Sequence, residues 1–333
     1  MDEKIRLSHG DGGSETHQLI KNVFYKHFNS SSSDAMPDSF VFEAIQGRLA
    51  FTTDSFVVKP LFFRGGNIGK LAVCGTVNDL STAGAIPLYI SAGFIIEEGF
   101  SIEKLHLVAK SMGDLCNQIG TKIVTGDTKV VENKNADGIF INTSGIGRVS
   151  EFYNPRRAEP GDEIIITGGI AEHGTAILID RYELSVEADL ISDCAPMCGL
   201  VVGLGSKLRD VKLMKDPTRG GLATALNEIA LEQELSIEVM EESIPMKSEV
   251  RAVNEILGTD PLYLACEGRM IIVVEKGFEK EVLQCVKTLD YCNQAGIIGQ
   301  FVSASHTMVY MNTGFGGKRI LPLLEDRTLP RIC

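Results

Sequence analysis

Hydrophobic and polar positions along the chain alternate between the repeat of a strand and the repeat of a helix. Residues 88–96 form a nearly continuous apolar run, which predicts a strand. Ser101 then provides a helix cap, and apolar side chains recur every three or four positions as far as Gly120. This pattern predicts a helix between Ser101 and Gly120, and residues 122–125 predict the next strand.

The second half of the chain continues the alternation. Residues 163–167 and 269–275 are short β-rich runs, and the apolar positions after Thr218 fall on one face of a predicted helix. Mixed strands and helices predict an α/β or α+β fold. The length of 333 residues suggests two domains, at roughly 150 residues each.

The boundary between the two domains is predicted at residues 151–162, where two prolines and a glycine lie between strands. We therefore expect an N-terminal domain over 1–150 and a C-terminal domain over 151–320. Within the first domain, residues 1–35 are expected to form a flexible glycine-rich leader. The final segment, 321–333, contains two prolines that disfavour a helix, and we expect it to be a mobile tail.

Charge and cysteine content exclude several classes of function. The 32 Lys and Arg against 44 Asp and Glu leave a net charge of −12, without the cationic cluster that nucleic-acid binding needs. No apolar run approaches the roughly 18 residues of a membrane span, and the charged N-terminus lacks a secretory signal. The eight cysteines are scattered, and no further ligands stand beside Cys194 and Cys198 to complete a zinc site. We expect a reduced, cytoplasmic protein.

The common nucleotide-binding loops are not present. Residues 64–71 look like a P-loop, but Arg64 replaces the first glycine and Leu71 replaces the hydroxyl residue that would hold magnesium. No G-x-G-x-x-G turn follows a predicted strand, so a Rossmann dinucleotide site is not predicted either.

Four aspartates lie in or at the ends of apolar or β-rich runs. They are Asp54, Asp79, Asp127 and Asp216. Hard oxygen ligands suit Mg²⁺, which usually binds through a few carboxylates plus substrate phosphates. Lys129 follows one of these aspartates, and Gly220 and Gly221 open a helix whose N–H groups could approach an anion. Loop aspartates also serve as turn or cap residues, so the pattern alone leaves both interpretations open.

Three further residues could carry chemistry. The glycine-rich segment 9–14 is either a flexible leader or a flap over phosphate, in which His9 could contact a reacting group. Glu267 lies just before a predicted strand and is either a base or a surface charge. Cys333 is the last residue, and an extended tail ending in a thiol resembles a swinging arm. The adjacent terminal carboxylate would raise the pKa of this thiol, and Arg331 could partly offset that effect.

Taken together, the motifs resemble the HypE family of hydrogenase maturation factors over nearly the whole chain. The aspartate motifs are shared with a wider superfamily of aminoimidazole ribonucleotide synthetase, selenophosphate synthetase and thiamine monophosphate kinase, whereas the C-terminal motif is specific. In chain order the motifs are residues 9–13, Thr53-Asp54-Ser55-Phe56, Asn78-Asp79-Leu80-Ser81, Gly84-Ala85-Ile86-Pro87, Gly126-Asp127-Thr128-Lys129-Val130, Asp216-Pro217-Thr218-Arg219-Gly220-Gly221-Leu222 and Pro330-Arg331-Ile332-Cys333.

The resemblance implies a PurM-like, two-domain α/β (α+β) fold. In that fold the N-terminal mixed sheets of two chains pair into a homodimer, the C-terminal domain is an α/β sandwich, and ATP lies in a cleft beside the dimer interface. The resemblance also implies a reaction. A carbamoyltransferase, HypF, loads the terminal thiol with a carboxamide, which is dehydrated to a thiocyanate with ATP and Mg²⁺. The cyano group then passes to iron on a HypC–HypD complex and becomes a ligand of [NiFe] hydrogenase.

The resemblance assigns roles to residues of this chain. Cys333 carries the substrate, Glu267 is the first candidate for the base and His9 the second, and Lys129 neutralises phosphate or the activated oxygen. The implied metal ligands are Asp54, Asp79, Asp127 and Asp216. The implied ATP contacts are Gly12, Gly13, Asn78, Gly126, Thr128, Lys129, Arg219, Gly220 and Gly221.

Two alternatives remain open from the residues. One is a selenophosphate-synthetase-like or ribonucleotide-cyclising ATPase that acts on a free small molecule. Against it, the first cysteine is Cys74, so the N-terminal glycine-rich segment lacks a reactive thiol. The other is a non-catalytic carrier that binds nucleotide and presents Cys333 to partners.

Overall fold

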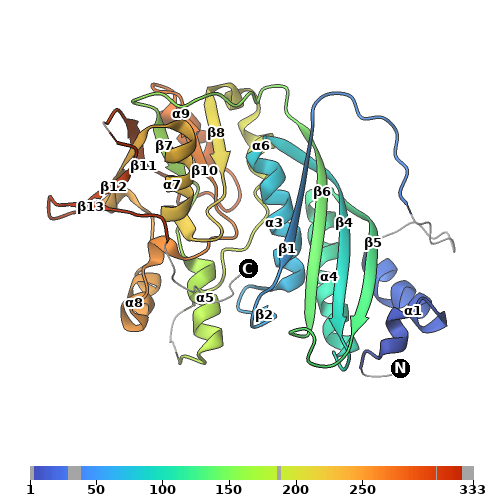
Figure 1. Ribbon diagram of the computed structural model, residues 1–333. Coiled ribbons are helices and arrows are strands. Elements are labelled where there is room, and N and C mark those ends of the chain that lie inside the picture. Colours follow the sequence, from blue (N-terminus) through green and yellow to red (C-terminus); the bar gives the residue numbers. More distant parts are fainter. Residues whose placement is uncertain (1–3, 29–38, 186–188, 305, 325–333) are drawn as a thin grey trace.

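The computed structural model describes residues 4–28, 39–185, 189–304 and 306–324 (Figure 1). Two sheets lie side by side, each with helices packed against it. Arg331 and Cys333, on which the swinging-arm hypothesis depends, lie outside the described residues. None of the described helices is long and apolar enough to cross a membrane.

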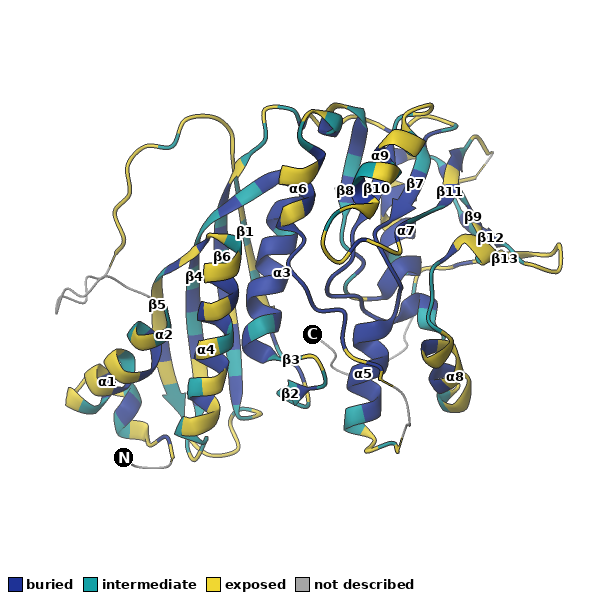
Figure 2. Ribbon diagram, turned by 180° about the vertical axis from the view of Figure 1, so that it is seen from behind, coloured by how far each residue is buried: buried dark blue, intermediate teal, exposed yellow. Residues whose placement is uncertain are grey.

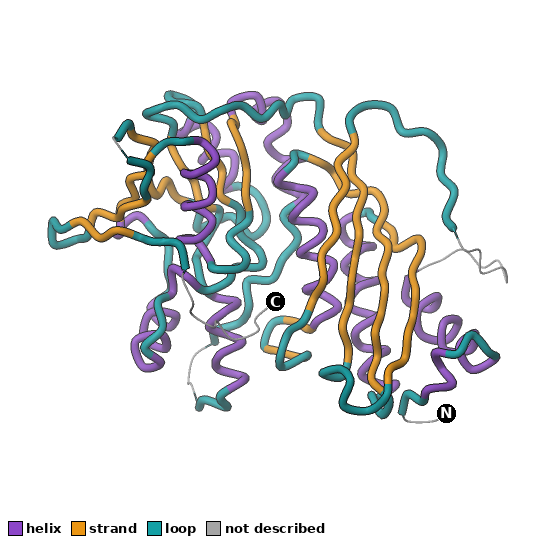
Figure 3. Tube along the Cα trace, in the orientation of Figure 1, coloured by secondary structure: helices purple, strands orange, loops and turns teal. Residues whose placement is uncertain are grey.

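The N-terminal half is built on a four-stranded mixed sheet in the order β1-β6-β4-β5. Its strands are β1 (Leu49–Phe56), β4 (Ala85–Glu97), β5 (Lys122–Val131) and β6 (Ile139–Val149), and only the β4–β5 pair is parallel. Helices α3 (Ile68–Thr82) and α4 (Ile102–Ile119) cover one face of this sheet (Figure 3). A small hairpin, β2 (Phe62–Phe63) and β3 (Gly66–Asn67), precedes α3.

The predicted strand–helix–strand unit in this half is confirmed. The Ser101 hydroxyl accepts a hydrogen bond from the Lys104 N–H at 3.3 Å, and Gly120 ends α4 in the left-handed conformation with φ of 73°. Glycine is suited to that position because it has no Cβ to clash there.

The flexible leader expected over residues 1–35 is wrong for the described part of that segment. Residues 7–28 form η1 (Leu7–Gly10), α1 (Ser14–Leu19), the π-helical η2 (Ile20–Tyr25) and α2 (Lys26–Phe28). These helices are fixed because Leu19, Val23 and Phe24 are buried, and the Phe24 ring stacks on Phe94 of β4 at 4.5 Å between centroids. These three side chains, spaced four and five positions from Leu19, form one helical face. Burial of this face stabilises the helices by more than the neighbouring glycines destabilise them.

The C-terminal half is a seven-stranded sheet in the order β13-β12-β9-β11-β7-β10-β8, in which only β9 and β12 pair in parallel. The strands are β7 (Glu163–Ile166), β8 (Val211–Lys215), β9 (Ser236–Met240), β10 (Ile271–Val274), β11 (Gly296–Val302), β12 (Val309–Asn312) and β13 (Lys318–Ile320). The helices are α5 (Glu172–Arg181), α6 (Cys198–Leu204), α7 (Gly221–Gln233), α8 (Ser248–Leu257) and α9 (Glu279–Lys287), with short 3₁₀ turns η3 (Gly205–Asp210), η4 (Glu241–Ser243) and η5 (Pro261–Tyr263).

Alternate side chains of this sheet enter two separate cores. Ile271 and Val273 pack with α7, whereas Ile272 and Val274 pack with α6 and α9. A strand that is buried on both faces reads as a continuous apolar run, which is why the β-rich runs at 163–167 and 269–275 predicted β7 and β10 correctly.

Helix α3 lies between the two halves of the chain. It contacts β1 and β6 on one side and α6 and β8 on the other, and Figure 2 shows it buried along most of its length, whereas α4 exposes one face. Asn78 on α3 ties the halves together. Its amide nitrogen donates to the carbonyls of Ala195 and Glu267 at 3.1 and 3.0 Å, and its carbonyl accepts from the Met197 N–H at 2.7 Å.

The start of the tail is also fixed. Leu321 is buried and its carbonyl accepts a hydrogen bond from the Asn227 amide at 2.8 Å, while the Pro322 carbonyl accepts one from the Tyr263 hydroxyl at 2.9 Å. The mobile tail expected from residue 321 therefore cannot include these first two residues, which an apolar contact and two hydrogen bonds hold in place.

Asn78→Ala is expected to lower the free energy of unfolding by about 2–4 kcal/mol, because it leaves three backbone groups without their partner at a buried junction. Thermal and urea unfolding measure the effect. Asn133→Ala is the matched control, because Asn133 is exposed and makes one long hydrogen bond to the Glu98 carbonyl, at 3.3 Å. Equal stability of the two variants would contradict this role of Asn78.

Candidate functional site

Three of the four predicted metal-ligating aspartates come together beside α3. Asp54 lies within β1 and not at its end, Asp79 is on α3, and Asp216 directly follows β8. The Asp79 carboxylate accepts a hydrogen bond from the Thr52 hydroxyl at 2.8 Å, which joins α3 to β1. The position of Asp54 differs from the strand-end expectation because β1 continues two residues further, to Phe56, whose buried side chain packs against α3.

Burial raises the pKa of each carboxyl in this group, and repulsion by neighbouring carboxylates raises the pKa of Asp79 and Asp216 further. Desolvation is the largest cause for all three, and for Asp216 the charges of Asp79 and Asp54 add to it and raise the pKa to about 6. Lys215 and Arg219 act in the opposite direction on the pKa of Asp79. The group therefore holds more negative charge than its surroundings compensate, which favours the binding of a cation.

The carboxylate oxygens of this group suit Mg²⁺ when water or phosphate oxygens supply the other ligands. Within the described ranges, no three His, Cys, Asp or Glu side chains converge closely enough to hold a metal ion by themselves. Carboxylate oxygens are hard ligands, and Mg²⁺ usually keeps waters or phosphate oxygens alongside one or two of them. The arrangement suits an ion that is shared with a nucleotide phosphate.

Asp127 and Lys129 are not part of this group within one chain. They lie on β5, at the opposite edge of the sheet from β1, with β6 and β4 between. Both side chains are exposed, and the Lys129 ammonium lies 3.3 Å from an Asp127 oxygen, whereas the intervening Thr128 is buried. Because side chains alternate along a strand, Asp127 and Lys129 point away from the face covered by α3 and α4. Gly126 packs against β4, where an added Cβ would lie 2.2 Å from the Ala92 carbonyl oxygen.

The N-terminal candidates are also near β5. His9 is buried in η1, and its Nδ1 accepts a hydrogen bond from the Arg6 N–H at 2.9 Å. A Cβ at Gly10 would meet the Val130 N–H nitrogen at 2.8 Å, so η1 lies directly against this strand. Gly12 and Gly13 form the turn before α1. Within one chain, His9 is therefore on the far side of the sheet from Glu267.

The glycine pair before α7 lies against the segment that carries Glu267. Gly220 and Gly221 have φ of 74° and 61°, and a Cβ at Gly221 would lie 2.5 Å from the Leu264 carbonyl oxygen. The Cys266 N–H donates to the Pro217 carbonyl at 3.0 Å. Glycine is needed here because any side chain would force the two segments apart. Arg219, in the same loop, is exposed.

Glu267 is a buried carboxyl and not a surface charge. Its side chain is 2% exposed, and its Oε1 has no hydrogen-bond partner in the described part of the chain. Burial raises the pKa of Glu267 well above its ordinary value, and electrostatic interaction with Cys194, Asp193, Asp216 and Asp54 raises it further. Unpaired buried carboxyls of this kind concentrate at functional sites.

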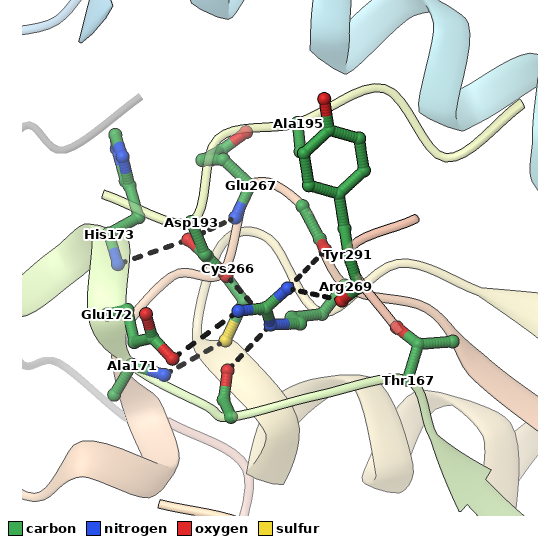
Figure 4. A network of polar contacts seen from close by, with 12 residues as sticks. Thr167, Ala171, Glu172, His173, Asp193, Ala195, Cys266, Glu267, Arg269 and Tyr291 are labelled. Atoms are coloured by element: carbon green, nitrogen blue, oxygen red, sulfur yellow. Dashed lines mark hydrogen bonds and ion pairs between the residues drawn. The ribbon is translucent and has the colours of Figure 1, made fainter. Parts of the chain in front are cut away.

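One further predicted site residue, Asn78, and one unpredicted pair, Asp193 and Arg269, also lie in this region. Asn78 lies within the site, but its amide is occupied by the contacts between the two halves, so it holds the site together and offers no free donor. Asp193 and Arg269 form a buried ion pair behind Glu267, with 3.5 Å between Oδ2 and Nε (Figure 4). The sequence gives no signal for this pair, because its members are 76 positions apart and each falls in an unremarkable context.

Asp216→Asn is expected to stabilise the protein when nucleotide and metal are absent. The pKa of Asp216 in the fold, about 6, is above its ordinary value of 3.8. The carboxyl therefore contributes fully to stability below pH 3.8 and loses this contribution as the pH rises through about 6. In EDTA, the variant should melt a few degrees above the wild type at about pH 7.5 and together with it only below the ordinary pKa, at about pH 3.5.

Asp290→Asn, at an exposed position, is the control and should leave the melting temperature unchanged at both pH values. A loss of stability in Asp216→Asn that is the same at both pH values would show that the carboxylate charge is not under strain.

Comparison with known proteins identifies the family. The N-terminal domain of AIR synthase related proteins matches residues 38–149, and the C-terminal domain of the same group matches residues 159–312. The carbamoyl dehydratase HypE of Rhizobium leguminosarum bv. viciae is 46% identical over 333 residues, covering 99% of this chain and 95% of that protein.

Solved structures agree with this relationship. A structure of the hydrogenase maturation protein HypE in complex with ATP matches with a TM-score of 0.94 and 41% identity, over 98% of this chain and 99% of that one. A HypE–HypF complex contains a chain with a TM-score of 0.80 and 44% identity, over 91% of this chain and 99% of that one. The chain thus has the PurM-like fold expected from its motifs, and it belongs to the carbamoyl dehydratase HypE family of hydrogenase maturation proteins.

Proposed function

We propose that this carbamoyl dehydratase converts an S-carboxamide on its own Cys333 to a thiocyanate at the expense of ATP, and so supplies cyanide for the iron of [NiFe] hydrogenase. The observation that carries the mechanism is Glu267, a buried carboxyl that has no counter-ion in the described part of the chain and lies within electrostatic reach of Asp54 and Asp216. A pure carrier would not need a buried, unpaired carboxyl at the centre of its fold, and relatives over the full chain are named as dehydratases.

The carboxylates of Asp54, Asp79 and Asp216 would hold Mg²⁺ together with phosphate oxygens of ATP. A relative of this fold is solved with ATP bound, which supports the nucleotide. When bound, the ion spreads the negative charge of the phosphoryl group in transfer. Gly220 and Gly221 bring the start of α7 close to the same place, where backbone N–H groups favour an anion.

The chemistry requires an activated oxygen and a base. A carboxamide oxygen is a poor leaving group, so it first attacks the γ-phosphorus of ATP, and ADP leaves as the carboxamide loses one N–H proton. The second N–H proton is then removed as the C–O bond breaks, which gives thiocyanate and inorganic phosphate. We assign the proton transfers to Glu267. Burial is the largest cause of the raised pKa of Glu267, and the charges of Asp216 and Asp54 add to it. Neutralising those two carboxylates would therefore lower the pKa of Glu267 and favour its action as a base.

The second face of the N-terminal sheet supports a homodimer. On the side opposite α3 and α4, Phe51 is 72% exposed and Ile95 is 44% exposed, and Phe40 and Phe42 pack against Tyr89 at the same sheet. Exposed apolar area of this kind is typical of an interaction surface. We propose that a second copy of the chain covers it.

A dimer through this face also gives a role to Asp127 and Lys129, which point to the same side of the sheet. Each chain would then place its Asp127 and Lys129 in the interface, where they can contact ATP held between the two chains. His9, Gly12 and Gly13, which lie near β5, would come close to the same interface. A dimer of this kind would therefore bring together the residues expected to contact ATP, which lie far apart within a single chain.

We propose HypF as the carbamoyl donor, supported by the relative that is solved in complex with HypF. A HypC–HypD complex would accept the cyano group. A cytoplasmic location is supported by the described cysteines, which are all unpaired, as is usual in a reducing compartment.

Glu267→Gln is expected to slow dehydration by about 10²–10⁴-fold, the usual contribution of a general base. Affinity for ATP should stay within about twofold of the wild type, because the amide is isosteric and Glu267 is not a proposed ATP contact. The rate is measured by mass spectrometry of the C-terminal peptide after carbamoylation by HypF, and ATP binding by calorimetry. Glu255→Gln, an exposed carboxyl on α8, is the control. Normal dehydration by Glu267→Gln would exclude this residue as the base.

Phe51→Glu is expected to produce a monomer that has lost ATP hydrolysis, because it places a charge in the proposed interface. Light scattering after size-exclusion chromatography gives the mass. Phe315→Glu is the matched control, because Phe315 is fully exposed on the turn between β12 and β13, away from the N-terminal sheet. A dimeric Phe51→Glu, or a monomer with full ATP hydrolysis, would contradict the proposed interface.

A further inference from the structure

The buried ion pair behind Glu267 does more than fill the interior of the C-terminal domain. The side chain of Asp193 is 0% exposed, and its two oxygens have different partners. Oδ1 accepts from the backbone N–H of Glu267 at 3.2 Å and from that of His173 at 3.1 Å, while Oδ2 faces Arg269. Asp193 is therefore the point where the segment of Glu267 is fixed to the start of α5 (Figure 4).

Arg269 fixes the same segment from its other end. Its Nε donates to the Gly169 carbonyl at 2.7 Å, and one terminal nitrogen donates to the carbonyls of Gly268 and Tyr291 at 3.1 and 3.2 Å. The other terminal nitrogen lies 3.4 Å from a Glu172 oxygen. A planar guanidinium with this many partners has little freedom to move.

The two segments that carry Asp193 and Glu267 are in direct backbone contact. A Cβ at Gly268 would lie 1.9 Å from the Asp193 carbonyl oxygen, so only glycine allows this approach. The Glu267 carbonyl in turn accepts hydrogen bonds from the Asn78 amide at 3.0 Å and the Ala195 N–H at 3.5 Å. The main chain of Glu267 is thus held on both sides, whereas Oε1 of its side chain is left without a partner.

We propose that Asp193 is a positioning residue for the dehydration. Its carboxylate, held by Arg269, fixes the main chain of Glu267 so that the carboxyl of Glu267 is aimed at the reacting group. The inference rests on the proposed role of Glu267 as the base. A displacement of the order of 1 Å in a catalytic group can cost about 10²-fold in rate, so the hydrogen bond to the Glu267 N–H is expected to matter for turnover.

The charge distribution offers a matched control for this inference. Glu172 is also a buried carboxylate that faces Arg269, and its second oxygen lies 2.8 Å from the Lys247 ammonium. Glu172 makes no contact with the main chain of Glu267 in the described part of the chain. Asp193→Asn and Glu172→Gln each remove one carboxylate from the same cluster. Only Asp193→Asn disturbs Glu267, because an amide NH₂ must face either Arg269 or the two backbone N–H groups.

The test is single-turnover dehydration of the full-length chain, carbamoylated on Cys333 by HypF, with loss of water from the C-terminal peptide followed by mass spectrometry. Asp193→Asn should lower the rate about tenfold or more at saturating Mg·ATP and leave half-saturation by ATP within about twofold. Glu172→Gln should stay within about threefold of the wild-type rate, although its melting temperature falls. In a Glu267→Gln background, Asp193→Asn should cause no further loss.

Three results would overturn the inference: a wild-type rate in Asp193→Asn, an equal loss in Glu172→Gln, or the same fold-loss from Asp193→Asn with and without Glu267. If Asp193→Asn does not fold, Asp193→Glu keeps the charge opposite Arg269 but displaces the acceptor oxygen, and a wild-type rate in that variant would also overturn it. A wild-type rate in Glu267→Gln alone would instead refute the proposed base, so the two failures are distinguishable.

Discussion

Helix α3 is buried on nearly every side, because the sheet of one domain and the loops of the other both pack against it, and the site depends on this arrangement. Asp79 and Asn78 are neighbours on α3. One projects a carboxylate toward Asp54 and Asp216, and the other ties the Glu267 segment to the helix. The same packing that joins the domains therefore desolvates the carboxyls and raises their pKa values, which prepares them for cations and for proton transfer.

Two kinds of buried carboxyl lie close together in this region. Some face a cation and others do not, and this difference determines what each can do. Asp193 and Glu172 face Arg269 and Lys247, so their charges are partly compensated and they can fix main-chain geometry. Glu267 has no such cation among the described residues, and Asp79 and Asp54 raise the pKa of Asp216 by repulsion. The compensated pairs give rigidity, whereas the uncompensated group stores the electrostatic free energy that nucleotide and metal binding would release.

Much of the fold could be predicted from the sequence, because apolar periodicity and capping residues act locally. The strand–helix–strand unit around Ser101 and the helix after Thr218 followed from such signals, and the motif order identified the family. The helices at residues 7–28 were missed, because the glycines and polar residues there conceal a short apolar face that matters only against Phe94. Strand order decides that Asp127 and Asp54 lie at opposite edges of the sheet, and no local pattern reveals it. The burial of Glu267 and its support by Asp193 depend on contacts between distant segments.

ATP activates the carboxamide in the proposed mechanism by phosphorylating its oxygen, and the formation of this bond can be tested directly. The measurement is to carbamoylate Cys333 with a carbamoyl group that carries an isotopically labelled oxygen, add Mg·ATP, and analyse the released phosphate by mass spectrometry. Transfer of the labelled oxygen into inorganic phosphate, in proportion to the thiocyanate formed, is the predicted result. Release of the label as water, with unlabelled phosphate, would contradict the account, because ATP would then act without forming a bond to the substrate.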